Sequence, residues 1–347
     1  MKPVLSIIIP LYNSINFFDA IYSEIKTIFD RYSAKVEYIL VDDGSTDGTF
    51  DLFAGISRLM PTVFLYQKKN GGISSARNYG FSKSSGDFVF FHDHDDFIDI
   101  DSMAFVLNEL EKLNCDYFQF EAFKVNGGLV DNAVEICKSD IANQLKKNDL
   151  VNNMFFNLCH FRQKEKYVSR VGFVWSCIFK SSFLKEHKIL FKSIVNYEDD
   201  YTFLFQVLIN SPSIYLEKKG IYYWNNYATS TSATHKYDYT SLEKLSCLRS
   251  FLEEKLNFSA FKDNKNVLNN VLWGFYNDYL VQYFVKNQNR SFGEFKNICK
   301  TTPLRESMIS SHRRVLSIKQ KVVNLLFRFR LYCLIYFLLS SHYKLKN

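Results

Sequence analysis

The sequence predicts an α/β fold built on a mostly parallel sheet flanked by helices, followed by an α-helical C-terminal appendage. First, short apolar runs alternate with helical patterns over the first 120 residues, which is typical of a parallel sheet with right-handed crossovers. Second, the pattern changes from about Tyr237 onward to long helical stretches only. Third, 347 residues can hold one large domain plus an appendage. We therefore expect two domains, residues 1–230 and 231–347.

The N-terminal pattern contains four strands and three helices. Val4–Ile9 is a continuous β-branched run, typical of a strand buried on both faces. The next strands are expected at Val36–Val41, Thr62–Tyr66 and Phe88–His92. The intervening helices are expected at Asn16–Arg31, Asp47–Met60 and Ser74–Ser84, the second of them capped by Ser45 or Thr46.

The rest of the chain continues with strands and helices and then turns wholly helical. Further strands are expected at Asp116–Phe123, Val174–Phe179 and Ile214–Leu216. Further helices are expected at Asp101–Leu113, Glu198–Ile209, Ser241–Leu256, Val267–Asn287 and Val315–Leu339.

Charge is distributed unevenly between the two predicted domains. Residues 1–235 hold 24 Lys and Arg against 28 Asp and Glu, whereas residues 236–347 hold 19 against 8. Such asymmetry indicates a basic appendage that meets an anionic surface, either nucleic acid or lipid. The low content of Gly (13) and Pro (5) excludes a collagen-like or largely disordered chain.

The cysteines and the apolar runs indicate a cytoplasmic protein. Seven widely spaced cysteines fit neither a disulfide framework nor a zinc motif. The N-terminal residues lead directly into a strand, so we expect no signal peptide. No run of 18 uncharged apolar residues occurs, so we expect no ordinary transmembrane helix.

Polar clusters follow each of the first four strands. The four clusters are Pro10–Asn13, Asp42–Asp47, Asn70–Asn78 and Asp93–Asp96. Each alone fits ordinary turn and cap chemistry. In open parallel sheets, however, ligands bind beyond the carboxyl ends of the strands, and four such clusters in register favour one shared crevice.

The cluster Asp93-His94-Asp95-Asp96 is the sharpest of these signals. Three carboxylates within four residues repel one another unless a cation neutralises them. Mg²⁺ or Mn²⁺ bound to a diphosphate is the expected guest, because such ions prefer oxygen ligands. His94 is expected to point the other way by the period of two in a strand-like stretch, with metal ligation as the alternative.

Two more segments have open alternatives. Asn70–Asn78 is a Gly-Gly turn leading into a helix that carries Arg77, which suits either a bound anion or a plain capped helix. Tyr197–Asp200 opens a helix, so its acids either stabilise the helix dipole or return to the crevice as a general base.

Together the motifs resemble those of the family 2 glycosyltransferases. The resemblance rests on Ser6–Asn13, Val41–Thr49, Gly71–Asn78, the acidic motif Asp93–Asp96 and the pair Glu198-Asp199, and it covers residues 4–227. It implies a GT-A fold, which is Rossmann-like, and inverting transfer of a sugar, of the hexosyltransferase class, from a nucleotide-sugar donor.

The resemblance also implies roles for individual residues. Asp199 is the expected base that deprotonates the acceptor hydroxyl, with Glu198 orienting it. Asp95 is expected to hold the metal, with Asp93 or Asp96 sharing it or contacting the ribose. Trp175 is the expected floor of the acceptor site. The remaining residues expected to bind the nucleotide-sugar are Pro10, Tyr12, Asn13, Asp42, Asp43 (to the imide of uracil, hence a UDP-sugar) and Arg77.

The sequence departs from the family pattern in the acidic motif. His94 stands where a small residue is commoner, and Ile98–Asp101 stands where a proline often follows. A mobile loop is implied at Tyr222–Ser232. Beyond it, His235 is expected to be a surface residue, with metal ligation as the alternative.

Two other function classes are weaker. A nucleotidyltransferase acting on sugar phosphates would need a glycine-rich, cationic loop after the first strand, and Pro10–Asn13 has neither feature. A nucleic-acid-binding protein would suit the basic C-terminal part but not the acidic crevice, so no nucleic-acid partner is expected.

The C-terminal segment predicts where the protein works. After Glu306 there are eight Lys and Arg and no acidic residue. The longest uncharged stretch, Leu331–Tyr343, is too short to span a membrane. We expect an in-plane helix on the anionic inner face of the cell membrane, with packing against the catalytic domain as the alternative. A lipid-linked or other saccharide acceptor, in lipopolysaccharide, capsule or other cell-surface polysaccharide synthesis, would then be accessible.

Overall fold

The structure is a computed structural model. It describes residues 2–126, 129–135, 173–194, 199–210, 212–225, 242–257, parts of 268–280, 291–310 and 318–344. The chain divides into two compact units, the second of which contains Lys236–Asn347. The first unit contains Met1–Phe155, Tyr167–Ser193 and Asp199–His235.

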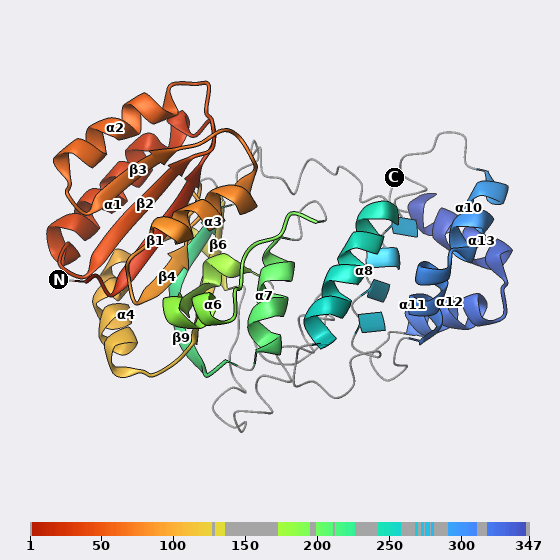
Figure 1. The fold of residues 1–347 in the computed structure, drawn as a ribbon. Helices are drawn as coiled ribbons and strands as arrows, with labels where there is room; N and C mark the ends of the chain where they lie inside the picture. Colours follow the sequence, from red (N-terminus) through yellow and green to blue (C-terminus); the bar gives the residue numbers. More distant parts are fainter. Residues whose placement is uncertain are drawn as a thin grey trace. The chain divides into compact units, whose positions relative to one another are not determined.

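The first unit is built on a nine-stranded sheet with the order β3-β2-β1-β4-β8-β6-β9-β5, and β7 pairs with β6. One half is parallel, as predicted, and contains β1 (Leu5–Leu11), β2 (Val36–Asp42), β3 (Val63–Gln67) and β4 (Phe88–Phe91). Figure 1 shows β1, β2 and β3 side by side with helices on both sides.

The other half of the sheet is mixed. β8 (Cys177–Lys180) runs antiparallel to β4 and to β6 (Tyr117–Asn126), while β9 (Ile214–Asn225) runs parallel to β6. β5 (Phe97–Ile98) and β7 (Leu129–Glu135) are antiparallel to β9 and β6.

Two of the expected strands differ in extent. The single strand expected at Val174–Phe179 is wrong, because Val174–Ser176 forms a 3-10 turn before β8 begins. β9 continues far beyond the expected Ile214–Leu216 because it pairs with β6 along most of its length, across irregular registers.

Helices cover both faces of the parallel half. Leu5, Ile7 and Ile9 of β1 belong to a core cluster with apolar residues of α1 (Phe18–Tyr32), α2 (Thr49–Leu59) and α4 (Ile100–Lys112). The opposite face is covered by α3 (Ile73–Lys83) and α7 (Asp199–Ile209). The remaining short helices are Ile15–Phe17, a 3-10 turn, and α6 (Ser181–Glu186).

Helix α3 approaches the sheet closely at Gly80. A Cβ atom added at Gly80 would lie 2.5 Å from Cγ2 of Ile8 and 3.2 Å from Cγ2 of Val41. Only glycine allows this spacing, because a side chain would push the helix away from β1 and β2.

The cap predicted for α2 is wrong. Neither Ser45 nor Thr46 caps it; the residue before the helix is Gly48, with φ of 91°. The carboxylate of Asp47 accepts hydrogen bonds from the backbone N–H and the hydroxyl of Thr49, at 3.0 and 2.6 Å. The side chain of Asp47 thus provides a hydrogen-bond acceptor for the backbone N–H of Thr49, the first residue of α2.

The second unit is helical in its described residues, as predicted. It contains α8 (Leu242–Asn257), helical pieces between 268 and 280, and then α10 (Phe292–Lys300), α11 (Thr302–Ser310), α12 (Ile318–Arg328) and α13 (Tyr332–Lys344). α12 packs on α11 and α13, and α13 on α10.

The single helix expected at Val315–Leu339 is broken at Arg330. Arg330 has φ of 58°, in the left-handed region. The N–H of Leu331 donates to the carbonyl of Leu326 at 2.9 Å, and that of Arg330 to Phe327 at 3.1 Å. This pair of bonds is a Schellman motif, which ends α12 without a glycine.

None of the helices in the described residues has the length and apolarity needed to cross a membrane. Within the same residues, five cysteines are free thiols: Cys115, Cys177, Cys247, Cys299 and Cys333.

Candidate functional site

The four polar clusters meet at one edge of the sheet, where β1 to β4 end. Asn13 and the second cluster are joined by two hydrogen bonds of 2.9 Å, from its N–H to Ser45 and from the N–H of Thr46 to its side chain. The N–H of Gly72 donates to Asp43 at 2.7 Å, and Arg77 contacts Asp93 at 2.6 Å. The predicted convergence of the four clusters at this edge is therefore present.

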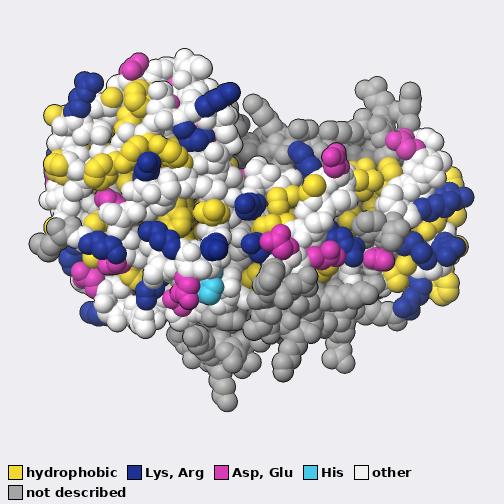
Figure 2. Space-filling model, viewed as in Figure 1, with side chains coloured by type: hydrophobic (Ala, Val, Ile, Leu, Met, Phe, Trp, Pro, Cys, Tyr) yellow, Lys and Arg dark blue, Asp and Glu magenta, His cyan; other side chains and the backbone are white. Residues whose placement is uncertain are grey.

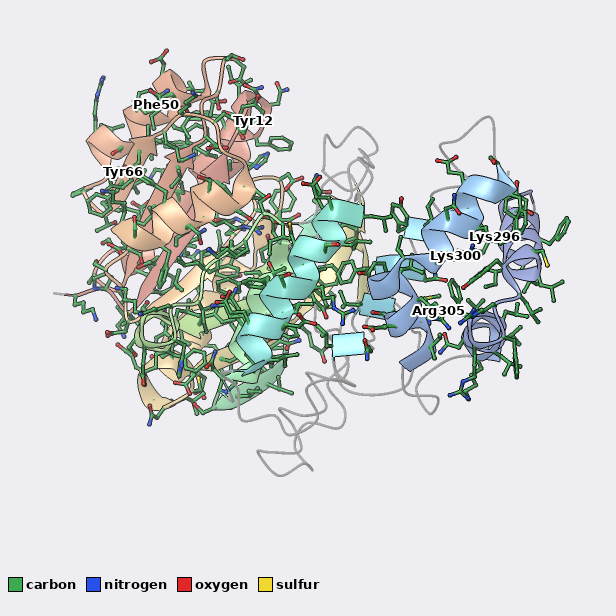
Figure 3. The ribbon with its side chains drawn as sticks, turned by 45° about the vertical axis from the view of Figure 1, so that its right-hand side comes forward. Tyr12, Phe50, Tyr66, Lys296, Lys300 and Arg305 are labelled. Atoms are coloured by element: carbon green, nitrogen blue, oxygen red, sulfur yellow. The ribbon has the colours of Figure 1, made fainter. Side chains whose placement is uncertain are left out.

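The first cluster offers one exposed aromatic ring. Tyr12 is 50% exposed at the carboxyl end of β1 (Figure 3). Pro10 is buried inside β1, whereas Asn13 is exposed and also bonds the loop after β2. Their predicted contacts with a nucleotide-sugar stay predictions.

Asp42 and Asp43 are buried and bind protein groups. Asp42 accepts hydrogen bonds from Ser45 and Gln67. Asp43 accepts from the backbone N–H groups of Gly71 and Gly72 and pairs with Lys68. The negative group that binds the N–H groups at the start of α3 is therefore the carboxylate of Asp43. The predicted bond of Asp43 to uracil stays a prediction that must compete with these donors.

The acidic cluster Asp93–Asp96 forms a turn. The strand-like geometry used for His94 is wrong, because β4 ends at Phe91 and the N–H of Asp96 donates to the carbonyl of Asp93. His94 packs edge-on against Phe17, with ring centres 5.1 Å apart.

Hydrogen bonds from residues of β9 fix the conformation of this turn. The hydroxyl of Tyr222 donates to Asp96 at 2.7 Å and accepts from the N–H of Asp93 at 3.2 Å. The other oxygen of Asp96 accepts from the N–H of Asn225 at 2.8 Å. Nδ1 of His92 lies 3.2 Å from the Tyr222 hydroxyl, and its Nε2 lies 3.3 Å from Glu24. Asp96 is therefore a structural anchor of the turn.

The three acids differ in what they can offer a metal. Burial raises the pKa of Asp95, helped by Asp93 and opposed by His94. Asp95 has no hydrogen-bonding partner from another residue in the described part of the chain. Asp93 uses one oxygen for Arg77, and the described residues contain no ready group of three or more metal ligands. Asp95 with the second oxygen of Asp93 still fits Mg²⁺ or Mn²⁺, which often takes one or two carboxylates plus substrate phosphates.

Arg77 links the acidic turn to α7. Its side chain is 3% exposed, and its two terminal nitrogens bind Asp93 at 2.6 Å and Asp200 at 2.7 Å. Burial lowers the pKa of Arg77, but the two carboxylates outweigh it and raise the pKa overall. The guanidinium also lies over the Phe191 ring. Its predicted contact with the donor stays a prediction, whereas this bridge is a role that the sequence did not reveal.

Asp199 stands at the start of α7, beside the bridge. Burial raises the pKa of Asp199 to about 6, while the hydrogen bond from Ser74 opposes the rise. Oδ1 of Asp199 is buried and has no hydrogen-bonding partner in the part of the chain that is described. Glu198, the other predicted catalytic residue, lies outside the described residues.

The predicted acceptor residue Trp175 belongs to an aromatic stack. Its ring stacks on Phe173 and on Tyr222, with centres 4.9 and 5.1 Å apart, and it is 4% exposed. The N–H of the preceding Val174 donates to Asp200 at 3.1 Å. The acceptor role of Trp175 stays a prediction, and His235 lies outside the described residues.

These features define a class. A mixed sheet flanked by helices, with an acidic turn after its fourth strand and buried acids at the same edge, has the architecture of the GT-A fold. Ser74, Asp200 and Tyr222 also belong to the site, although the sequence analysis included them only within Asn70–Asn78, Tyr197–Asp200 and Tyr222–Ser232 and gave none of them an individual role. Their only sequence signal is position: Ser74 lies one turn before Arg77, and Asp200 directly follows Asp199.

Comparison with known proteins gives the family. Residues 6–171 match the family model described as "Glycosyl transferase family 2". The resemblance to this family, which the motifs predicted, is therefore confirmed over these residues.

Individual relatives agree with this assignment. An uncharacterized glycosyltransferase of Bacillus subtilis, EpsJ, is 22% identical over 64% of this chain and 61% of the relative. A cholesterol galactosyltransferase of Borreliella burgdorferi is 22% identical over 68% of this chain and 64% of the relative. The chain therefore spans less than two thirds of the length of these relatives.

Among solved structures, residues 1–349 of S. aureus TarS in complex with UDP-GlcNAc share the fold. The TM-score is 0.67 and the identity 18%, covering 100% of this chain and 93% of the other.

Proposed function

We propose that this protein is an inverting, divalent-metal-dependent glycosyltransferase that moves a sugar from a UDP-sugar to a saccharide or lipid-linked saccharide. Its family domain and GT-A fold support the reaction class. Uridine diphosphate is favoured because TarS, which shares the fold, was solved with UDP-GlcNAc and with UDP.

The main observation behind the proposal is the raised pKa of Asp199. A general base works best when its pKa lies near the working pH. A pKa of about 6 leaves the carboxylate largely ionised at neutral pH and still able to take a proton. An exposed surface aspartate, with a lower pKa, would be a weaker base.

The chemistry is a direct displacement at the anomeric carbon of the donor. The acceptor oxygen forms the new bond as the bond between that carbon and the diphosphate oxygen breaks. Asp199 takes the proton of the acceptor hydroxyl, and the electron pair leaves with the diphosphate. Attack opposite the leaving group inverts the configuration at that carbon.

Asp95 and Asp93 would hold Mg²⁺ or Mn²⁺ in this proposal. The ion, when bound, would offset negative charge on the departing diphosphate. The network of Tyr222 and Asn225 with Asp96 keeps the turn that carries both carboxylates in one conformation.

A panel of nucleotide-sugars tests the donor assignment. We expect UDP-sugars with Mn²⁺ to raise the melting temperature and to be hydrolysed slowly, whereas GDP-sugars do neither. Stabilisation by GDP-sugars alone would show the uracil assignment to be wrong. Absence of any effect across the panel would contradict the function.

We also propose that the protein works at the anionic inner face of the cell membrane, through the α12–α13 surface. This surface consists of the exposed apolar side chains of α12, α13 and the turn between them: Val322, Leu325, Phe329, Leu331, Leu334, Phe337 and Leu338. Lys321, Arg328 and Arg330 are exposed among them. Figure 2 shows basic and hydrophobic side chains intermixed over the end that carries these helices.

The other sides of α12 and α13 already have partners. Val323, Leu326, Phe327, Ile335 and Leu339 are buried, so the exposed set is a second apolar face. Apolar side chains beside cations suit a bilayer surface, where each cation near anionic lipid contributes about 1 kcal/mol.

Replacing both Phe329 and Phe337 by Glu tests the surface. The two rings are 63% and 67% exposed, so the fold should survive. The fraction floating with phosphatidylglycerol vesicles should fall about tenfold or more, because apolar insertion is lost and acidic groups are added. Leu59→Glu, at an exposed site on α2, is the control. Equal flotation of wild type and double variant, or no flotation of either, would contradict the proposal.

A further inference from the structure

Helices α3 and α7 are joined by two adjacent polar contacts. The hydroxyl of Ser74 donates to Oδ2 of Asp199, and Nη1 of Arg77 donates to Oδ1 of Asp200 at 2.7 Å. Ser74 and Arg77 are three residues apart and so share one face of α3. Asp199 and Asp200 are the first two residues of α7. The start of α7 is therefore fixed to α3 at two points.

The two contacts leave different atoms available. Both oxygens of Asp200 are used, by Arg77 and by the N–H of Val174. Asp199 uses Oδ2 for Ser74, whereas its Oδ1 is buried and has no partner in the described residues. A buried acceptor without a partner costs about 1–3 kcal/mol, and such exceptions call for a specific explanation.

We propose that Ser74 is a positioning residue for the base Asp199, holding Oδ2 so that Oδ1 is left for the acceptor hydroxyl. This inference rests on the proposed function. The same hydroxyl stabilises the ionised form of the carboxylate, so one contact sets both the orientation and the charge of the base.

The charged surroundings of Asp199 agree with this role. After burial, which raises its pKa, the hydrogen bond from Ser74 is the strongest influence and lowers the pKa. Asp200, its neighbour on α7, raises the pKa, and Arg77 from α3 lowers it. Loss of the Ser74 hydroxyl would therefore leave Asp199 protonated at a pH where it is now ionised.

The variant Ser74→Ala gives a signature that a purely structural role would not. A hydrogen bond to an ionised group is worth about 1.5–3 kcal/mol, and about 1.4 kcal/mol corresponds to a tenfold effect. We expect kcat/KM for release of UDP from the UDP-sugar to fall at every pH, because Oδ1 is no longer held toward the acceptor, and to fall about tenfold further at pH 5 than at pH 8.5, because Asp199 is then protonated. Ser74→Thr should restore the wild-type profile. Ser82→Ala, at an exposed site of α3, is the matched control.

A second measurement does not depend on activity. Carboxyl ¹³C NMR, with the Asp199 signal identified by its loss in Asp199→Asn, should show Asp199 titrating at higher pH in Ser74→Ala than in wild type. An unchanged titration, or a loss of activity equal at every pH, would overturn the role of Ser74. If wild type releases UDP from no donor, the proposed function fails, while the NMR titration still decides whether Ser74 controls Asp199.

Discussion

Asp199→Asn is expected to lower the turnover number by about two to four orders of magnitude, the range typical of a lost general base. Asparagine keeps the size of the side chain and can still accept the hydrogen bond from Ser74, so the start of α7 should stay in place. It cannot take a proton from the acceptor. Calorimetric titration with UDP and Mn²⁺ should show donor-site affinity close to that of wild type.

The pH dependence of wild-type kcat/KM tests the same role of Asp199. In the proposed reaction Asp199 would act as a base only when ionised, and its pKa is about 6. Wild-type kcat/KM should therefore be flat above that pH and fall tenfold per pH unit well below it. Asp101→Asn, at an exposed carboxylate on α4, should leave both rate and profile unchanged. Full activity of Asp199→Asn would remove Asp199 from the mechanism.

Arg77→Met is expected to lower the free energy of unfolding by about 3–5 kcal/mol, the usual cost of removing one partner from a buried ion pair. The variant keeps most of the side-chain volume but leaves Asp93 and Asp200 without their shared cation. Arg77→Lys should also destabilise the protein, because one ammonium group cannot reproduce the two-pronged contact of a guanidinium. Urea denaturation followed by tryptophan fluorescence measures both.

The pair of Arg31 and Asp101 provides the control. Both side chains are exposed, and the nitrogen and oxygen lie 3.0 Å apart. Exposed pairs contribute little because water already solvates both charges. Arg31→Met should leave the urea midpoint unchanged. A midpoint for Arg77→Met equal to that of Arg31→Met would show that the bridge does not stabilise the fold.

The sequence could predict the parallel half of the sheet because its signal is local. β1 is a continuous run of residues buried on both faces, and each later strand of this half is followed by polar turn residues. Because parallel strands end at one edge, the convergence of Asp43, Arg77 and Asp93 could also be predicted.

Hydrogen-bonding partners could not be predicted in the same way, because they come from distant segments. Glu24 lies on α1, yet its carboxylate meets His92 and the N–H of Ile98. No periodicity marks a buried acid of this kind. Asp43 has its donors in the Gly71–Gly72 turn, which only the folded sheet brings near it.

The break at Arg330 was missed for a different reason. A left-handed residue at a helix end is usually glycine or asparagine. An arginine there carries no local signal, and the apolar residues on both sides continue the helical period. Only the bonds from Arg330 and Leu331 back into α12 show where that helix stops.

The close approach at Gly80 makes the geometry of the candidate site depend on a residue that lies outside it. Arg77 and Ser74 lie about one and two turns before Gly80 on the same helix, so the distance between α3 and β1 determines how far both side chains reach toward α7. One methyl group at residue 80 would move the helix and so separate the hydroxyl from the carboxylate that it orients. A substitution in this part of the core is therefore expected to alter the proposed reaction even when every residue of the candidate site is unchanged.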